Sequence, residues 1–134
     1  MPYSYIGFLF NWKLFCRGNR MKTIDEIQMT PNQQLALSEL RQRLIDQFDI
    51  HAMQLFGSVV RGETDDESDI DLLIVTKHPL KRTVRHQITD IVFEINLRCD
   101  TNFSTLVVDR DSWESGLLSV LPIHNEILKE GVAL

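Results

Sequence analysis

The fold of this chain is decided by residues 55–75, L-F-G-S-V-V-R-G-E-T-D-D-E-S-D-I-D-L-L-I-V. The first letters end a short apolar-rich segment, Ile50–Phe56, which stops at a Gly-Ser pair and so predicts a strand followed by a tight turn. Residues 62–68 are polar, acidic and turn-forming, which predicts a loop. The apolar run Ile70–Val75 then predicts a mostly buried strand. Two strands joined through a turn and an acidic loop are therefore expected here.

The flanking sequence predicts helices on both sides of these strands. Thr30 and Gln33 form a capping-box pattern around Pro31, a residue that suits the first position of a helix. Apolar residues then recur at helical spacing, as Leu37, Leu40, Leu44 and Phe48. Further on, the patterns predict a long helix at 80–97, a strand at 103–108, a helix start at 111–114 with a capping carboxylate, and a last helix at 122–130. This order predicts an α/β (α+β) domain with a small mixed sheet flanked by helices.

Asp69 and Asp71 stand at the start of the second predicted strand. Residues two apart on a strand point to the same face, so their carboxylates are expected side by side. Adjacent carboxylates repel one another, and a cation relieves that cost. Mg²⁺ or Mn²⁺ is the natural partner, because such ions are held by one or two carboxylates together with substrate phosphates. The pair is therefore a candidate metal site, with a solvated or capping pair as the plainer interpretation.

The Gly57-Ser58 pair suits a phosphate-binding turn. A glycine directly after a strand permits a tight turn and a close approach of the backbone to a ligand. If a helix begins at Ser58, its exposed N–H groups and its dipole form an anion site, to which the Ser58 hydroxyl adds a donor. Arg61, one turn later, can bring a guanidinium toward the same phosphates. Phosphate cradle and candidate metal ligands are thus expected on neighbouring strand ends.

Together, the runs G-S-V-V-R-G and S-D-I-D-L-L-I-V closely resemble the signature of the DNA polymerase β-type nucleotidyltransferase superfamily, and the short chain resembles its minimal branch. The resemblance implies that superfamily's fold from about Pro31 to Val108. It implies nucleotide binding by Gly57, Ser58 and Arg61, and a catalytic role for Asp69 and Asp71 as Mg²⁺ or Mn²⁺ ligands. It also implies transfer of AMP from ATP to a hydroxyl of a partner protein, by an antitoxin that acts with a HEPN-domain ribonuclease.

The sequence departs from that pattern at one point. The family usually adds a third carboxylate from the next-but-one strand, which here is the predicted strand at 103–108. That strand holds no Asp or Glu, and Ser104 stands at the expected position. Asp100 precedes the strand and Asp109 follows it, and a partner could also supply the group.

The missing carboxylate leaves a second function open, a nucleotide-binding antitoxin or adaptor that acts by contact and turns over weakly or not at all. A small-molecule acceptor is a third hypothesis. It needs a second domain to hold the acceptor, and the residues after Val108 are too few to build one, although a homodimer with a shared cleft would provide the space.

Composition narrows the class of protein further. The chain has 134 residues, enough for one modest core, and a homo-oligomer fits that size. A net charge of -5 predicts no direct nucleic-acid binding.

The cysteines show no metal-ligand spacing and no apolar run is long enough to span a membrane, so a cytoplasmic protein is expected. The basic cluster Lys77, Lys81, Arg82 and Arg85 is expected to be a solvated helix face, with a phosphate or acidic-partner contact as the alternative.

The first twenty residues differ from the rest, because they carry most of the aromatic residues and no acidic residue. Their basic residues follow the apolar run, which is the reverse of a signal peptide. We expect Met21 to be the biological start. Residues 1–29 are accordingly predicted to be an N-terminal extension and residues 30–134 the nucleotidyltransferase domain.

Overall fold

The computed structural model describes residues 22–63 and 68–134, so the predicted start at Met21 and most of the acidic loop lie outside the described residues. In chain order the elements are η1 (Ile24–Glu26), α2 (Pro31–Gln47), β1 (Ile50–Phe56), α3 (Ser58–Arg61), β2 (Ile70–Thr76), α4 (Arg82–Cys99), β3 (Phe103–Asp109), α5 (Arg110–Glu114), η2 (Leu117–Val120), α6 (Pro122–Glu130) and β4 (Val132–Ala133).

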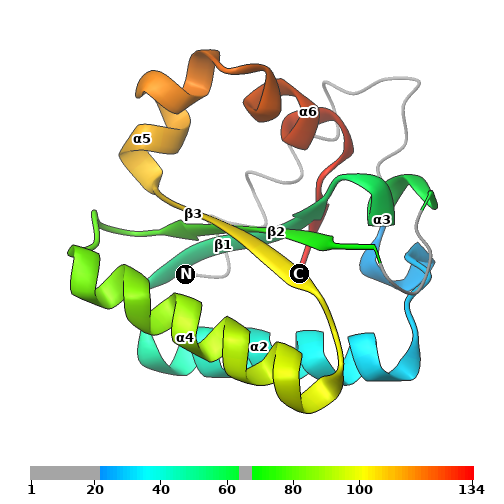
Figure 1. Ribbon diagram of the computed structural model, residues 1–134. Coiled ribbons are helices and arrows are strands. Elements are labelled where there is room, and N and C mark those ends of the chain that lie inside the picture. The colour runs from blue at the N-terminus through cyan, green and yellow to red at the C-terminus, as the bar shows by residue number, and fades with distance from the viewer. Residues whose placement is uncertain (1–21, 64–67) are drawn as a thin grey trace.

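The strands form one mixed sheet in the order β3-β2-β1-β4. β1 runs antiparallel to β2 and β4, whereas β2 and β3 are parallel and are connected through α4. Figure 1 shows α2 and α4 on one face of the sheet, and α5 and α6 on the other. The predicted fold class, a small mixed sheet flanked by helices, is confirmed. Within the described residues, no helix is long and apolar enough to cross a membrane.

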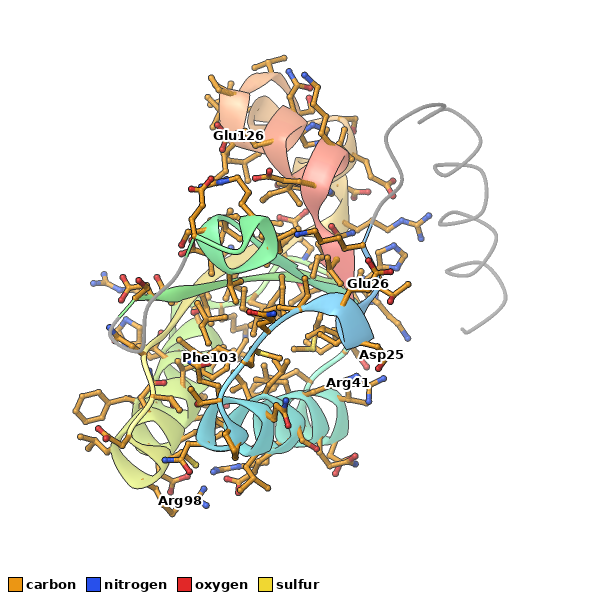
Figure 2. The ribbon with its side chains drawn as sticks, turned by 90° about the vertical axis from the view of Figure 1, so that its right-hand side faces the viewer. Asp25, Glu26, Arg41, Arg98, Phe103 and Glu126 are labelled. Atoms are coloured by element: carbon orange, nitrogen blue, oxygen red, sulfur yellow. The ribbon has the colours of Figure 1, made fainter. Side chains whose placement is uncertain are left out.

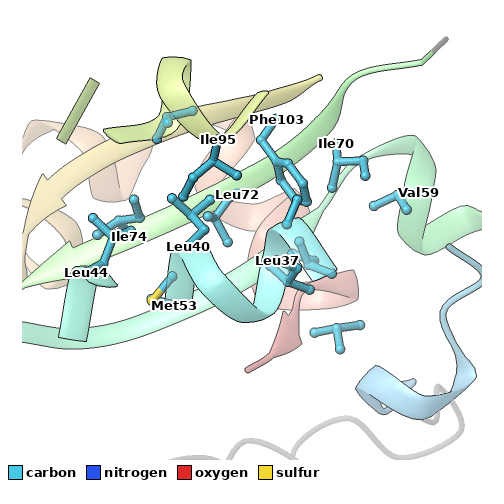
Figure 3. Close-up of a cluster of buried hydrophobic side chains, with 14 of the residues drawn as sticks. Leu37, Leu40, Leu44, Met53, Val59, Ile70, Leu72, Ile74, Ile95 and Phe103 are labelled. Atoms are coloured by element: carbon cyan, nitrogen blue, oxygen red, sulfur yellow. The ribbon is translucent and has the colours of Figure 1, made fainter. Parts of the chain in front are cut away.

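Side-chain alternation along β2 divides the core into two clusters. Ile70, Leu72 and Ile74 pack with the helices α2 and α4 in the larger cluster, part of which Figure 3 shows. Leu73 and Val75 point to the opposite face, where Trp113 and the helix α6 cover them. Because side chains alternate along a strand, Asp71 lies on this second face. The fold therefore assigns the acidic residue to the side of the sheet that carries α5 and α6.

The capping box predicted for α2 is present. The Thr30 hydroxyl accepts from the Gln33 N–H at 3.2 Å, and the Thr30 N–H donates to the Gln33 side chain at 2.9 Å. The strands and the helix at 122–130 were predicted within a residue of their observed bounds, and the long helix lies two residues later than predicted.

At the C-terminal end, one prediction needs correction and one element was missed. The carboxylate that caps α5 is that of Asp109, which accepts from the Ser112 N–H at 3.0 Å, and Asp111 lies inside the helix. The short strand β4 was not predicted. It follows Gly131 directly and pairs with β1, so that Val132 is fully buried opposite Leu55.

Candidate active site

One edge of the sheet brings the end of β1 together with the starts of β2 and β3. Phe56, the last residue of β1, is in register with Asp71. On the other side of β2, Asp71 is in register with Ser104 of β3. The residues that follow β1 and those that begin β2 therefore share one end of the sheet, as the sequence predicted.

Gly57 lies directly against the Asp71 carboxylate. Its backbone has φ 79° and ψ -153°, a conformation that L side chains rarely adopt. A Cβ atom built on Gly57 would lie 2.3 Å from Asp71 Oδ2. Only a glycine permits this approach, so the turn backbone and the carboxylate form one continuous surface.

The helix expected at Ser58 exists, but it is only four residues long. Its last N–H groups already donate to Gly57: the N–H of Val60 at 3.1 Å and that of Arg61 at 3.4 Å, both to the Gly57 carbonyl. So few aligned peptides sum to a small dipole. Any affinity of this turn for an anion must therefore come from individual N–H groups and the Ser58 hydroxyl, and not from a macrodipole as the sequence suggested.

The two candidate metal ligands differ in their surroundings. Asp69 is exposed, and its Oδ1 accepts a hydrogen bond from the Asn102 side chain. Asp71 is half-buried. Burial raises the pKa of Asp71, the neighbouring charge of Asp69 raises it further, and Arg61 partly offsets both. The carboxylates are thus close enough to repel, and a cation between them would relieve the repulsion.

Arg61 lies near these carboxylates, but its guanidinium is paired elsewhere. Its Nε donates to Glu63 Oε2 at 3.3 Å and its Nη1 to Glu130 Oε1 at 2.7 Å, and the two glutamates raise the pKa of Arg61. Glu130 belongs to the last turn of α6, 69 residues away in the chain. Sequence reasoning missed both Glu130 and Asn102, because no local pattern links either residue to the motif.

Asp109, one of the two acidic residues proposed as the third carboxylate, does not reach this site within its own chain. Asp109 is in register with Thr76, at the opposite end of β2, and its two oxygens bond to Ser112. Asp100 ends α4 in a left-handed conformation, with φ 54°. Among residues 22–63 and 68–134, no group of three or more His, Cys, Asp or Glu side chains is arranged to hold a metal ion.

The basic cluster lies away from this edge of the sheet. Lys77 follows the far end of β2, and Lys81 and Arg82 begin α4 from there. Arg85 donates from Nη1 to the carbonyl of Val107 at 2.8 Å, near the end of β3. The basic cluster and the Gly57 turn are therefore separated by the length of a strand, and the contact with phosphates or an acidic partner stays a prediction.

A cavity of about 510 Å³ opens elsewhere, between η1, α2 and Leu134. Asp25 and Arg41, labelled in Figure 2, are among its lining residues, and most of its wall is apolar. It includes none of the residues around the Gly57 turn. The acid pair and its turn therefore lie outside this cavity.

The segment that holds the turn and the acid pair matches a known protein family. Residues 37–122 match the model of the nucleotidyltransferase domain, and this span includes the turn, both aspartates and Ser104. The chain belongs to the nucleotidyltransferase domain family.

The individual proteins that resemble this nucleotidyltransferase share only part of its length or a low sequence identity with it. A curated protein of Methanocaldococcus jannaschii, named as a candidate protein adenylyltransferase, is 38% identical over 77 residues, which is 54% of this chain and 52% of that protein. The chain thus spans about half the length of the curated relative that it matches. A crystallised toxin–antitoxin complex with AMP-PNP contains a chain of the same fold, with a TM-score of 0.51 and 16% identity over 78% of this chain and 72% of that chain.

The Gly57 contact predicts a difference between two glycine substitutions. Gly57→Ala is expected to lower the free energy of unfolding by about 3 kcal/mol, because it combines backbone strain with a collision against Asp71. Gly62→Ala is the matched control: Gly62 also has a positive φ, of 72°, but nothing lies within 4 Å of an added Cβ, so the loss should be about 1 kcal/mol. Urea unfolding measures both. Equal losses would show that Asp71 does not crowd Gly57.

Asp71 predicts a pH-dependent stability. Its pKa in the folded protein is above the ordinary 3.8, so its charged form destabilises the folded state once the pH exceeds that raised value. With chelator present, Asp71→Asn is expected to raise the free energy of unfolding at pH 7. The gain should shrink as the pH falls through the raised pKa and vanish below 3.8. Urea unfolding across this range tests the prediction, with Asp90→Asn as an exposed control. A loss of stability at pH 7 would contradict it.

Proposed function

We propose that this protein is a metal-dependent nucleotidyltransferase that transfers AMP from ATP to a hydroxyl group of a partner protein. The observation that carries the proposal is the contact of the Gly57 backbone with the Asp71 carboxylate, because it places the turn after β1 against a candidate metal ligand. Nucleotidyl transfer needs both features side by side: donors for the triphosphate, and carboxylates for the cation that bridges to it.

The residues present fit a divalent cation with oxygen ligands. Asp69 and Asp71 point to the same face and repel each other, and Asp71 is held close to the turn. When bound, Mg²⁺ or Mn²⁺ would neutralise this charge and polarise the α-phosphate. In this proposal the two aspartates hold the cation, while the backbone and hydroxyl of Ser58 bind phosphate oxygens.

In this proposal Arg61 contacts the phosphates while it stays paired with Glu63 and Glu130. Its pairing with Glu63 and Glu130 restrains a long side chain near the turn, and its other guanidinium donors have no partner among residues 22–63 and 68–134. Those remaining donors can meet a phosphate oxygen without breaking both ion pairs. Arg61 therefore supports the phosphates from the side, and Glu130 ties the last turn of α6 to the site.

The reaction is balanced as a single displacement. An oxygen of the acceptor hydroxyl forms a bond to the α-phosphorus of ATP, the bond from that phosphorus to the β-phosphate bridging oxygen breaks, and pyrophosphate leaves. The proton of the hydroxyl passes to solvent or to a group of the acceptor. The backbone N–H groups of Gly57 and Ser58 stabilise the negative charge of the leaving pyrophosphate.

A protein acceptor is favoured by the surface on the face that carries Asp71. Leu117 and Val120 of η2 are 84% and 77% exposed, the highest values among the exposed large apolar residues of the described chain, although Leu35, Phe93 and Leu97 on α2 and α4 are also exposed. Such a patch is typical of contact with another protein. The patch supports a protein partner, and the resemblance to minimal nucleotidyltransferases suggests that this partner is a HEPN-like protein, with the chain acting as its antitoxin in the cytoplasm.

The second candidate function is an antitoxin or adaptor that binds nucleotide but acts by contact alone. It is favoured by the serine that stands where the family usually carries a third carboxylate. The two functions differ in what the aspartates do. In the contact function, neutralisation of the partner survives their substitution, whereas in the transferase function it does not.

The transferase function predicts that Asp69→Asn and Asp71→Asn each reduce Mg²⁺-dependent label transfer from α-labelled ATP to the co-expressed partner by more than about 100-fold. Asp90→Asn, at an exposed position of α4, should leave the transfer unchanged. γ-Labelled ATP should give no labelled partner, because the β- and γ-phosphates leave as pyrophosphate. Transfer at the wild-type rate in both variants would refute the proposed activity.

A further inference from the structure

Ser104 occupies the place in this site from which a third acidic ligand would come. It is the residue of β3 in register with Asp71, and in a parallel pair such residues lie on the same face of the sheet. The next residues of β3 on that face, Leu106 and Val108, pack with the cluster under α6, which confirms the face. Ser104 itself is exposed. A neutral hydroxyl therefore stands beside Asp71, one strand away.

The position of Ser104 is fixed by the fold. The Asn96 side chain of α4 bonds to both backbone groups of Phe103, accepting from its N–H at 2.9 Å and donating to its carbonyl at 3.0 Å. On the other side of the strand, the Ile70 N–H donates to the Asn102 carbonyl at 2.9 Å. These contacts pin the start of β3 against β2, so a shift of register that brings another residue beside Asp71 would break them.

Within the described strand β3, no acidic residue stands at the end that carries Ser104. Asn102, which contacts Asp69, is uncharged, and Asp109 is committed to capping α5 at the other end of β3. Among the described residues that begin β2 and β3, the carboxylates at this end of the sheet are those of Asp69 and Asp71. A second divalent cation, about 4 Å from the first in sites that hold two, needs a ligand charge of its own to offset the repulsion.

We propose that this site binds one divalent cation together with the nucleotide, and that the serine at position 104 is what excludes a second. The inference rests on the proposed function, since the nucleotide phosphates complete the ligand set of the single cation. In this proposal, Ser104 is the residue that determines how many divalent cations the site binds. Activation of the acceptor hydroxyl then depends on the acceptor's own groups, because no second cation is there to lower its pKa.

The test counts Mn²⁺ bound per bound nucleotide, using a non-hydrolysable ATP analogue, ultrafiltration and electron paramagnetic resonance of the free ion. Wild-type protein is expected to hold one Mn²⁺ per nucleotide. Ser104→Asp is expected to raise the count to two, because it places a carboxylate beside Asp71. Ser104→Asn, which matches the size of aspartate without its charge, should keep the count at one. Ser104→Glu is a second carboxylate variant should Ser104→Asp fail to fold.

The outcomes separate this inference from the proposed function. Two Mn²⁺ per nucleotide in the wild-type protein would overturn the inference and leave the transferase function standing. A count of one in both carboxylate variants would overturn the role given to Ser104. Failure of the wild-type protein to bind the analogue or Mn²⁺ at all would overturn the proposed function, and the inference with it.

Discussion

The contact between the Gly57 backbone and the Asp71 carboxylate is the constraint from which the rest of the site follows. It requires β1 to end opposite the start of β2, which the antiparallel register provides, and it requires a residue without a side chain at the turn. The same contact contributes to the burial of Asp71 and so to its raised pKa. A carboxylate with a raised pKa is one whose charged form a nearby cation would stabilise.

The core supports this arrangement through strand alternation. Ile70, Leu72 and Ile74 anchor β2 to α2 and α4, which leaves the alternate residues, Asp71 among them, for the face under α5 and α6. On that face the C-terminal elements return to the site: β4 pairs with β1, and Glu130 reaches Arg61. The chain after β3 therefore does more than cover the sheet, because it also restrains the one arginine expected to approach the phosphates.

Much of the fold and of the site was predictable from the sequence. Features that depend on residues close together in the chain were predicted, whereas contacts between residues far apart in the chain were not. The strands, the turn and the α2 capping box depend on residues within a few positions of one another, and so local patterns found them. The Glu130–Arg61 pair joins residues 69 positions apart, and the sequence holds no trace of it. The cap of α5 was expected at 111–114, whereas β3 extends one residue further than predicted and its last residue, Asp109, caps the helix.

The central claim, that the Gly57 turn and the acid pair form a nucleotide and metal site, is tested most directly by a crystal structure with a non-hydrolysable ATP analogue and Mn²⁺. The account predicts an anomalous Mn²⁺ peak between Asp69 and Asp71, with the triphosphate against the backbone of Gly57 and Ser58. It is contradicted if the nucleotide occupies the cavity between η1 and α2 instead, or if the Mn²⁺ peak lies away from both aspartates.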